Sequence, residues 1–192
     1  MAKVQVTKTN RNSYVISPVR LSYTHLTEPY RSDGAAPNDP GKYTTAVLIP
    51  KTETEAIAAI QAAVEEAAQR GKATVWGGRI PGNLKRPLRD GSEKDNGGEA
   101  YESAMFFNAS SKNRVPVYGP NRIPISDPEQ IYSGMWAAVE VAFYPFAVTA
   151  NKGVAVGLNS VMKIRDGERF GAAVATADVF DCVAVEDDDD DM

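Results

Sequence analysis

Basic and aromatic residues interleave through the middle of this 192-residue chain, and residues of these two types can together hold a nucleic-acid strand. Binding a single strand without reading its sequence needs positive charge along the phosphates and aromatic faces on which bases stack. The candidate residues are Trp76, Arg79, Lys85, Arg86, Arg89, Phe107, Lys112, Arg114, Tyr118, Arg122, Tyr132, Tyr144 and Lys152. The competing interpretation is structural, because strand aromatics usually fill cores and loop arginines are often only solvated.

The distribution of charge along the chain supports the binding interpretation. The formal net charge is −4, but the last acidic run alone contributes Glu186, Asp187, Asp188, Asp189, Asp190 and Asp191. Without these six, 21 basic residues remain against 19 acidic ones, and residues 69–122 carry ten basic and five acidic side chains. This asymmetry predicts single-stranded DNA as the partner and a regulatory tail that competes for the same groove.

Residue types that usually carry catalysis or metal binding are scarce. The chain has one histidine, His25, and one cysteine, Cys182, which cannot build the usual zinc ligand sets or an internal disulfide. The glycine-rich residues 77–82 lack the strand–helix context of a phosphate-binding loop. We therefore expect no metal, no cofactor and no enzymatic activity.

The sequence also lacks signals for membranes or export. No run of about 18 apolar residues is present, and the first 14 residues contain no apolar segment typical of a secretory signal. Together with the single cysteine, this predicts no membrane contact and a protein of the cytoplasm.

Hydrophobic periodicity predicts mostly strands, with one good helix. The expected strands are 13–26 (interrupted at Pro18), 42–49, 101–109, 114–118, 131–148, 153–164 and 178–185, with a turn at 151–153. A helix follows a capping box of Thr52 and Glu55, repeats apolar residues from Ile57 to Ala67, and is expected to stop at Gly71. Residues 28–41 and 72–100 are expected to be loops.

These elements indicate a mainly β fold in one domain. The strand number and the single amphipathic helix suit an OB-fold-like Greek-key barrel with long loops, and a β-sandwich is also allowed by the periodicity. We assign residues 1–185 to this binding domain and residues 186–192 to an acidic, flexible tail.

Several blocks of the sequence, taken together, resemble a known family. They are VRLSYTHLTEP (19–29), KYTTAVLIPK (42–51), LKRPLRDG (84–91), FFNASSKNRVPV (106–117), IYSGMWAAVEVAFYPF (131–146), NKGVAVGLNSVMKIRDGERFG (151–171) and the acidic end. In this order they are similar to the phage-encoded single-stranded-DNA-binding proteins, long catalogued as a domain of unknown function.

The resemblance implies an OB-fold body and a role in phage DNA replication or recombination, within the host cytoplasm. It also implies cooperative or dimeric behaviour in some relatives, so homodimer formation stays open here. Lys85, Arg86, Arg89, Lys112, Arg114 and Lys152 fall in the matching blocks and are the preferred DNA contacts.

Two hypotheses about the tail stay separate. Relatives of similar design end in acidic residues followed by an aromatic residue, whereas this chain ends in Met192. Competition by the tail for the DNA groove does not depend on that last residue, whereas docking onto replication or recombination proteins does. The alternative function is an accessory protein of the replication or recombination apparatus that acts mainly through protein contacts.

Overall fold

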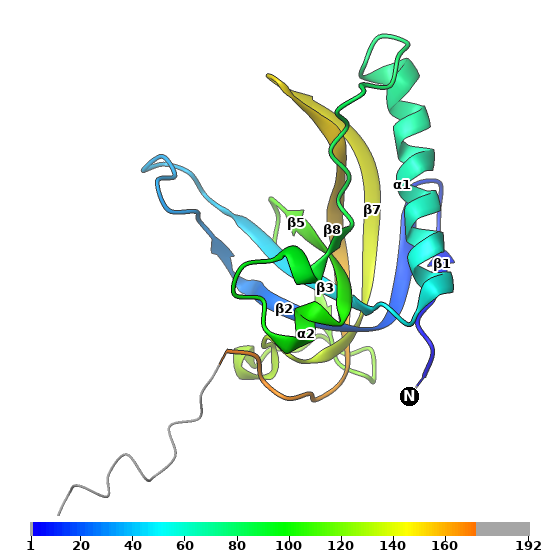
Figure 1. Cartoon of the computed structure of the whole chain (residues 1–192). Coiled ribbons are helices and arrows are strands. Elements are labelled where there is room, and N and C mark those ends of the chain that lie inside the picture. The colour runs from blue at the N-terminus through cyan, green and yellow to red at the C-terminus, as the bar shows by residue number, and fades with distance from the viewer. Residues whose placement is uncertain (1, 172–192) are drawn as a thin grey trace, which may run out of the picture.

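The computed structural model describes residues 2–171, which fold into a strongly twisted β-structure with one long helix on its side (Figure 1). The strands are β1 (Gln5–Lys8), β2 (Ser13–Tyr30), β3 (Lys42–Pro50), β4 (Arg89–Asp90), β5 (Ala104–Ser111), β6 (Val117–Tyr118), β7 (Trp136–Val148) and β8 (Asn151–Arg165). The helices are α1 (Thr54–Thr74) and α2 (Glu99–Glu102), with single 3₁₀ turns at Gly91–Glu93 and Pro128–Gln130.

Five of the strands close into a barrel. β2 pairs antiparallel with β3 and β7, β3 with β5, and β7 with β8. The ring is completed where β5 and β8 run parallel, with Ser110 opposite Gly157. This closure confirms the OB-fold-like barrel and excludes the two separate sheets of a β-sandwich.

Alternation along the strands decides which side chains fill the barrel. On β5, Phe107 and Ala109 point into the main core, whereas Phe106 belongs to a smaller cluster on the outside. Inside, the ring of Phe143 lies 5.6 Å from that of Tyr14 and 6.2 Å from that of Phe107, both edge-on. These rings fill the barrel, so the strands are held by packing as well as by backbone pairing.

Helix α1 covers one side of the barrel with its apolar stripe. Its buried residues recur at helical spacing and are Ala56, Ile60, Ala63, Val64, Ala67, Ala68 and Gly71. They pack mainly against β7, with further contacts to β1 and β8. Full burial of a side chain such as Ile60 stabilises the fold by about 1.5–3 kcal/mol, so α1 is a structural element.

The ends of α1 differ from the sequence prediction. The helix begins at Thr54, its N-cap is Glu53, and no side chain caps it, so the predicted capping box of Thr52 and Glu55 is wrong. It continues past Gly71 to Thr74. A Cβ on Gly71 would lie 2.5 Å from Cβ of Pro145 and 2.8 Å from the Trp76 ring, so this glycine permits close packing and does not end the helix.

Several other boundaries also shift. β2 extends to Tyr30, with a register shift against β7 between Ile16 and Val19, where Pro18 cannot donate to the ladder. Residues 99–102 form α2, so the strand predicted from residue 101 begins at Ala104. The strand predicted from residue 131 begins at Trp136. Residues 149 and 150 make the turn predicted at 151–153. The predicted strand 178–185 lies outside the described residues.

Candidate nucleic-acid interface

Two long hairpins frame one outer wall of the barrel. In chain order, β3 and β5 are the second and third strands of the ring, and OB folds bind ligands on that pair between the loops that join strands one to two and four to five. Here those connections are the β2–β3 and β7–β8 hairpins, which project as two arms on either side of β5 (Figure 1). The outer wall of β2, β3 and β5 is therefore the candidate interface.

Strand register determines what this wall presents. Leu48 pairs with Phe106, Ala46 with Asn108 and Thr44 with Ser110, and these rows face away from the core residues Val47, Ile49, Phe107 and Ala109. Toward the tip of the β2–β3 arm, the His25 and Tyr30 rings stack with centroids 4.8 Å apart and planes 31° apart. Tyr30 is 47% exposed and Tyr23 is 51% exposed, so large aromatic faces are open to solvent.

Two cations lie directly over aromatic rings at the other end of the wall. The Arg89 guanidinium is 4.8 Å from the centre of the Phe106 ring, and Lys94 Nζ is 4.9 Å from that of Tyr23 and 5.5 Å from that of Tyr101. We call Tyr23, Arg89, Lys94, Tyr101 and Phe106 the outer cluster. Within residues 2–171 neither cation of the outer cluster forms a salt bridge, so both charges remain available to a phosphate.

A short anchored turn presents these two cations. Asp90 accepts hydrogen bonds from the Ser92 backbone N–H at 2.9 Å and its hydroxyl at 2.7 Å, and pairs with Lys51 Nζ at 2.6 Å. The lysine bond, followed by the serine bonds, lowers the pKa of Asp90 from 3.8 to about 2. A Cβ on Gly91 would lie 2.0 Å from the Tyr101 carbonyl oxygen, so only glycine allows the turn to pack this closely. The turn thus holds the backbone at Arg89, which precedes it, and at Lys94, which follows it.

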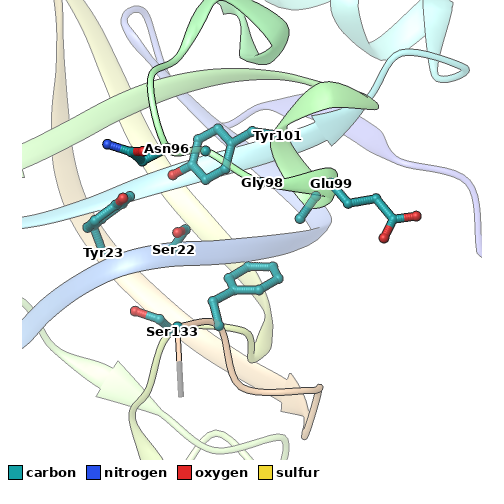
Figure 2. Close-up of a pocket in the computed structure, with 11 residues that line it drawn as sticks. Ser22, Tyr23, Asn96, Gly98, Glu99, Tyr101 and Ser133 are labelled. Atoms are coloured by element: carbon teal, nitrogen blue, oxygen red, sulfur yellow. The ribbon is translucent and has the colours of Figure 1, made fainter. Parts of the chain in front are cut away.

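A cavity of about 310 Å³ opens beside the outer cluster. Figure 2 shows Tyr101 above it, Ser22 and Tyr23 of β2 below, and Asn96 and Gly98 along one side. Tyr101 is 2% exposed, and its hydroxyl has no hydrogen-bond partner among residues 2–171.

Some predicted residues gather on the β7–β8 arm. The Lys85 backbone pairs with this arm, donating to the Lys152 carbonyl at 3.0 Å, and Lys85 Nζ donates to Asn151 Oδ1 at 2.7 Å. Tyr144 is 43% exposed on the same arm, and Lys152 is exposed at its tip. Arg79 is exposed in the preceding loop, whereas Arg86 pairs with Glu65 of α1 at 2.6 Å. The structure therefore brings Lys85, Tyr144 and Lys152 together.

Two predicted stacking residues are corrected. Phe107 is 0% exposed in the barrel core. Trp76 is 8% exposed, packs beside Gly71 and donates from Nε1 to the Phe146 carbonyl at 3.1 Å. Buried rings offer no face to a base, so neither is available for stacking in this structure.

The remaining predicted residues are spread around the barrel. Lys112 is exposed just after β5, beside the candidate interface. Arg114 and Tyr118 line a second cavity with Leu26, and Arg122 is exposed in the adjoining turn. Tyr132 is partly buried, and its hydroxyl donates to Asp166 at 2.9 Å and accepts from the Gly167 N–H at 3.0 Å, which indicates a structural role. The tail residues Glu186 to Asp191 lie outside the described residues.

Sequence reasoning missed most of the outer wall. It did not select Tyr23, Tyr30, Lys94, Tyr101 or Phe106. Strand alternation was the available signal, because it places Phe106 and Phe107 on opposite faces. Tyr101 could not be found that way, since it lies on α2, where the sequence predicted the end of a loop and the start of a strand.

Residues 2–171 bear on two further kinds of feature, a cluster of metal ligands and a membrane-spanning helix. In that part of the chain no three His, Cys, Asp or Glu side chains lie together as a metal site would require. No helix there has the length and apolar character needed to cross a bilayer.

Comparison with known proteins points in one direction. The model of the family described as Enterobacter phage Enc34, ssDNA-binding protein, matches residues 12–192. Protein p50 of Acyrthosiphon pisum secondary endosymbiont phage 1 is 30% identical over 186 residues, covering 91% of this chain and 96% of its own length.

Solved structures share the fold. The single-stranded DNA-binding protein from bacteriophage Enc34 in complex with ssDNA is 25% identical, with a TM-score of 0.70 over 89% of this chain and 100% of its own. The single-stranded DNA binding protein gp2.5 of bacteriophage T7 is 17% identical, with a TM-score of 0.56 over 86% of this chain and 98% of its own, which shows the fold alone.

Proposed function

The chain belongs to the family of the Enterobacter phage Enc34 ssDNA-binding protein, and from that premise we propose that it binds single-stranded DNA without sequence preference. The strands bound would be those exposed during phage DNA replication or recombination. Binding is an equilibrium in which cations neutralise phosphates and aromatic faces stack on bases, with no bond made or broken.

The outer wall of β2, β3 and β5 is the observation that carries this proposal. It offers the exposed Tyr23 with Lys94 over its ring, and the exposed Tyr30 farther toward the tip of the β2–β3 arm. Within residues 2–171, Arg89 and Lys94 form no salt bridge. Stacking on such rings contributes about 1–3 kcal/mol per base and tolerates any base, because every base has a π-face. The wall thus supplies both requirements for binding that does not depend on sequence.

The β7–β8 arm extends the same path. Lys85 and Lys152 place two cations on the arm that also carries the exposed ring of Tyr144, and Lys112 follows the last residue of β5. A strand that runs along the outer wall would meet these groups next. We therefore keep Lys85, Lys112, Tyr144 and Lys152 as DNA contacts, together with Arg89, and place Arg79, Arg86, Arg114, Tyr118 and Arg122 at the periphery.

Titration with salt tests the proposed function. Fluorescently labelled oligo-dT is expected to bind the full chain, with log K falling linearly against log salt at about 0.7 per phosphate contacted. A duplex of the same length serves as the comparison ligand. Absence of binding to oligo-dT at low salt would contradict the proposal.

The acidic tail is proposed to compete for this interface. Six acidic residues joined to the same chain are present at high effective concentration near the cations of the body. Deletion of residues 186–192 should raise the affinity for short oligo-dT at low salt, and the gain should shrink as salt screens the tail. Equal affinities of the full and truncated chains at low salt would refute competition.

A further inference from the structure

The cavity beside the outer cluster has a lining that suits a planar, hydrogen-bonding group. Its volume of about 310 Å³ lies at the lower end of the roughly 300–1,000 Å³ typical of small-molecule sites. Aromatic side chains, Tyr23, Tyr101 and Phe170, supply flat apolar surface, while Ser22 and Asn96 add polar groups (Figure 2). The cavity is therefore large enough for one such group and chemically mixed.

The Tyr101 hydroxyl is the unusual atom of this lining. Figure 2 shows it pointing toward Ser22 and Tyr23, into the cavity, yet no group within residues 2–171 forms a hydrogen bond with it at ordinary distance and angle, although the residue is 2% exposed. Burial raises the pKa of this phenol, and interaction with the Ser22 side chain opposes part of that shift. Native proteins rarely leave a buried polar atom unpaired, because its lost contact with water is not replaced.

We propose that this cavity receives one nucleobase of the bound strand, with the Tyr101 hydroxyl hydrogen-bonding to the base edge. The inference rests on the proposed function and adds a base-receiving pocket to the outer wall. A hydroxyl can both donate and accept, so it can pair with any of the four bases. The pocket therefore adds affinity for bases without imposing a sequence.

A cation lies close to two rings of the cavity lining. Lys94 Nζ is 4.9 Å from the Tyr23 ring centre and 5.5 Å from that of Tyr101, where it could meet the phosphate of an inserted nucleotide, while Glu99 is the acidic residue of the lining. Tyr23 is 51% exposed at the rim and offers a ring to the neighbouring base. Phosphate, base edge and stacking face would thus be met by adjacent side chains.

Two tyrosine-to-phenylalanine variants of the full chain separate a binding role from a structural one. Tyr101→Phe removes the unpaired hydroxyl, and Tyr14→Phe removes a hydroxyl that bonds Glu66 of α1 at 3.2 Å. Each variant is titrated with oligo-dT and with an abasic chain of the same length, and its thermal unfolding is measured.

Tyr101→Phe should weaken oligo-dT binding about threefold to tenfold, the effect of one lost hydrogen bond, and should leave binding of the abasic chain unchanged. Its unfolding temperature should equal or exceed that of the wild type, because no hydrogen bond of the free protein is lost. Tyr14→Phe should show the reverse pattern, with lower stability and unchanged binding of both ligands. Ser22→Ala, which changes the opposite side of the cavity, should also weaken binding of oligo-dT alone.

The failure of this inference is distinct from failure of the proposed function. The base pocket is refuted if the wild type binds oligo-dT but Tyr101→Phe and Ser22→Ala bind both ligands as the wild type does. The proposal that the outer wall binds single-stranded DNA is then unaffected. A Tyr101→Phe protein that unfolds at a lower temperature would also overturn it, because the hydroxyl would then have a structural partner. If the wild type binds neither ligand, the proposed function itself fails.

Discussion

The side of the barrel covered by α1 and the outer wall of β2, β3 and β5 use the same residue types in opposite ways. Beside α1, Lys8 pairs with Glu66 at 3.0 Å and Arg86 with Glu65 at 2.6 Å. On the outer wall, Arg89 and Lys94 instead lie over aromatic rings. The cations beside α1 are therefore paired with carboxylates, whereas Arg89 and Lys94 form no salt bridge within residues 2–171.

The aromatic residues divide in the same way. Tyr14 lies edge-on to Phe143 against the core, and its hydroxyl bonds Glu66. Tyr23 is half exposed, and the hydroxyl of Tyr101 has no partner in the described part of the chain. A surface whose polar groups are satisfied internally stabilises the fold, whereas one that leaves them unsatisfied is suited to binding. Five variants test this division.

The largest effect is expected on stability, from a buried residue of α1. Ile60→Ala removes a side chain that is 0% exposed, and should lower the free energy of unfolding by about 2–5 kcal/mol, as measured by urea denaturation. The affinity of the folded fraction for oligo-dT should not change, because α1 lies away from the outer wall. A weaker affinity in the folded protein would show that α1 also contributes to binding.

Tyr23→Ala should weaken binding of oligo-dT and change the stability of the fold little. Loss of one stacking ring is expected to reduce the affinity for oligo-dT by about 1–3 kcal/mol, or roughly 5-fold to 150-fold. The side chain is 51% exposed, so the free energy of unfolding should fall by about 1 kcal/mol or less. Unchanged affinity in fluorescence titrations would remove Tyr23 from the proposed interface.

The variants Lys94→Gln and Lys8→Gln test one cation on the outer wall and one cation beside α1. If Lys94 contacts one phosphate, its loss should reduce the slope of log K against log salt by about 0.7, measured with oligo-dT from low to moderate salt. Lys8 is paired with Glu66, so its substitution should leave the slope unchanged. Equal slopes for wild type and Lys94→Gln would mean that Lys94 serves only its aromatic neighbours.

The smallest effect concerns the anchoring of the turn at Asp90. Its pKa is about 2 in the folded chain, below the ordinary 3.8, so its contribution to stability is complete above about pH 4 and is lost as the pH falls through 2. Asp90→Asn should therefore lower the unfolding temperature slightly at pH 5. The difference from wild type should shrink toward pH 2 in thermal melts. A constant difference across this range would show that the carboxylate charge is not what anchors the turn.

The sequence predicted the barrel strands well where alternation was clear and poorly where the chain crosses the surface. Residues 42–49 and 153–164 were found almost to their ends, because both carry β-branched residues and end at turns or proline. Residues 99–100 were predicted as loop and 101–102 as strand, but all four form α2, since burial of Tyr101 against Phe106 holds the segment across the sheet. Tertiary packing there overrides local preference.

In the candidate site, too, tertiary packing decided features that the sequence did not predict. Phe107 was selected as a stacking residue, but Phe107 is in the core, and its neighbour Phe106 lies under Arg89 on the opposite face, where it is 3% exposed. Strand side chains alternate between faces, so an error of one residue moves a side chain from one face of the sheet to the other. The prediction for Trp76 failed for another reason. Its burial depends on close packing against Gly71 and on a hydrogen bond to the carbonyl of Phe146, which is far away in the sequence.

By itself, the sequence determined the class of this protein. Hydrophobic periodicity indicated a β-rich body, and the positions of the charged residues indicated an excess of positive charge outside the acidic end, because these properties depend only on the order of residues in the chain. Only the tertiary structure decided which cations are paired, which rings face outward and that a cavity forms beside Tyr101. These features require segments far apart in the chain to meet, and the barrel, α1 and the surface loops bring them together only in the folded protein.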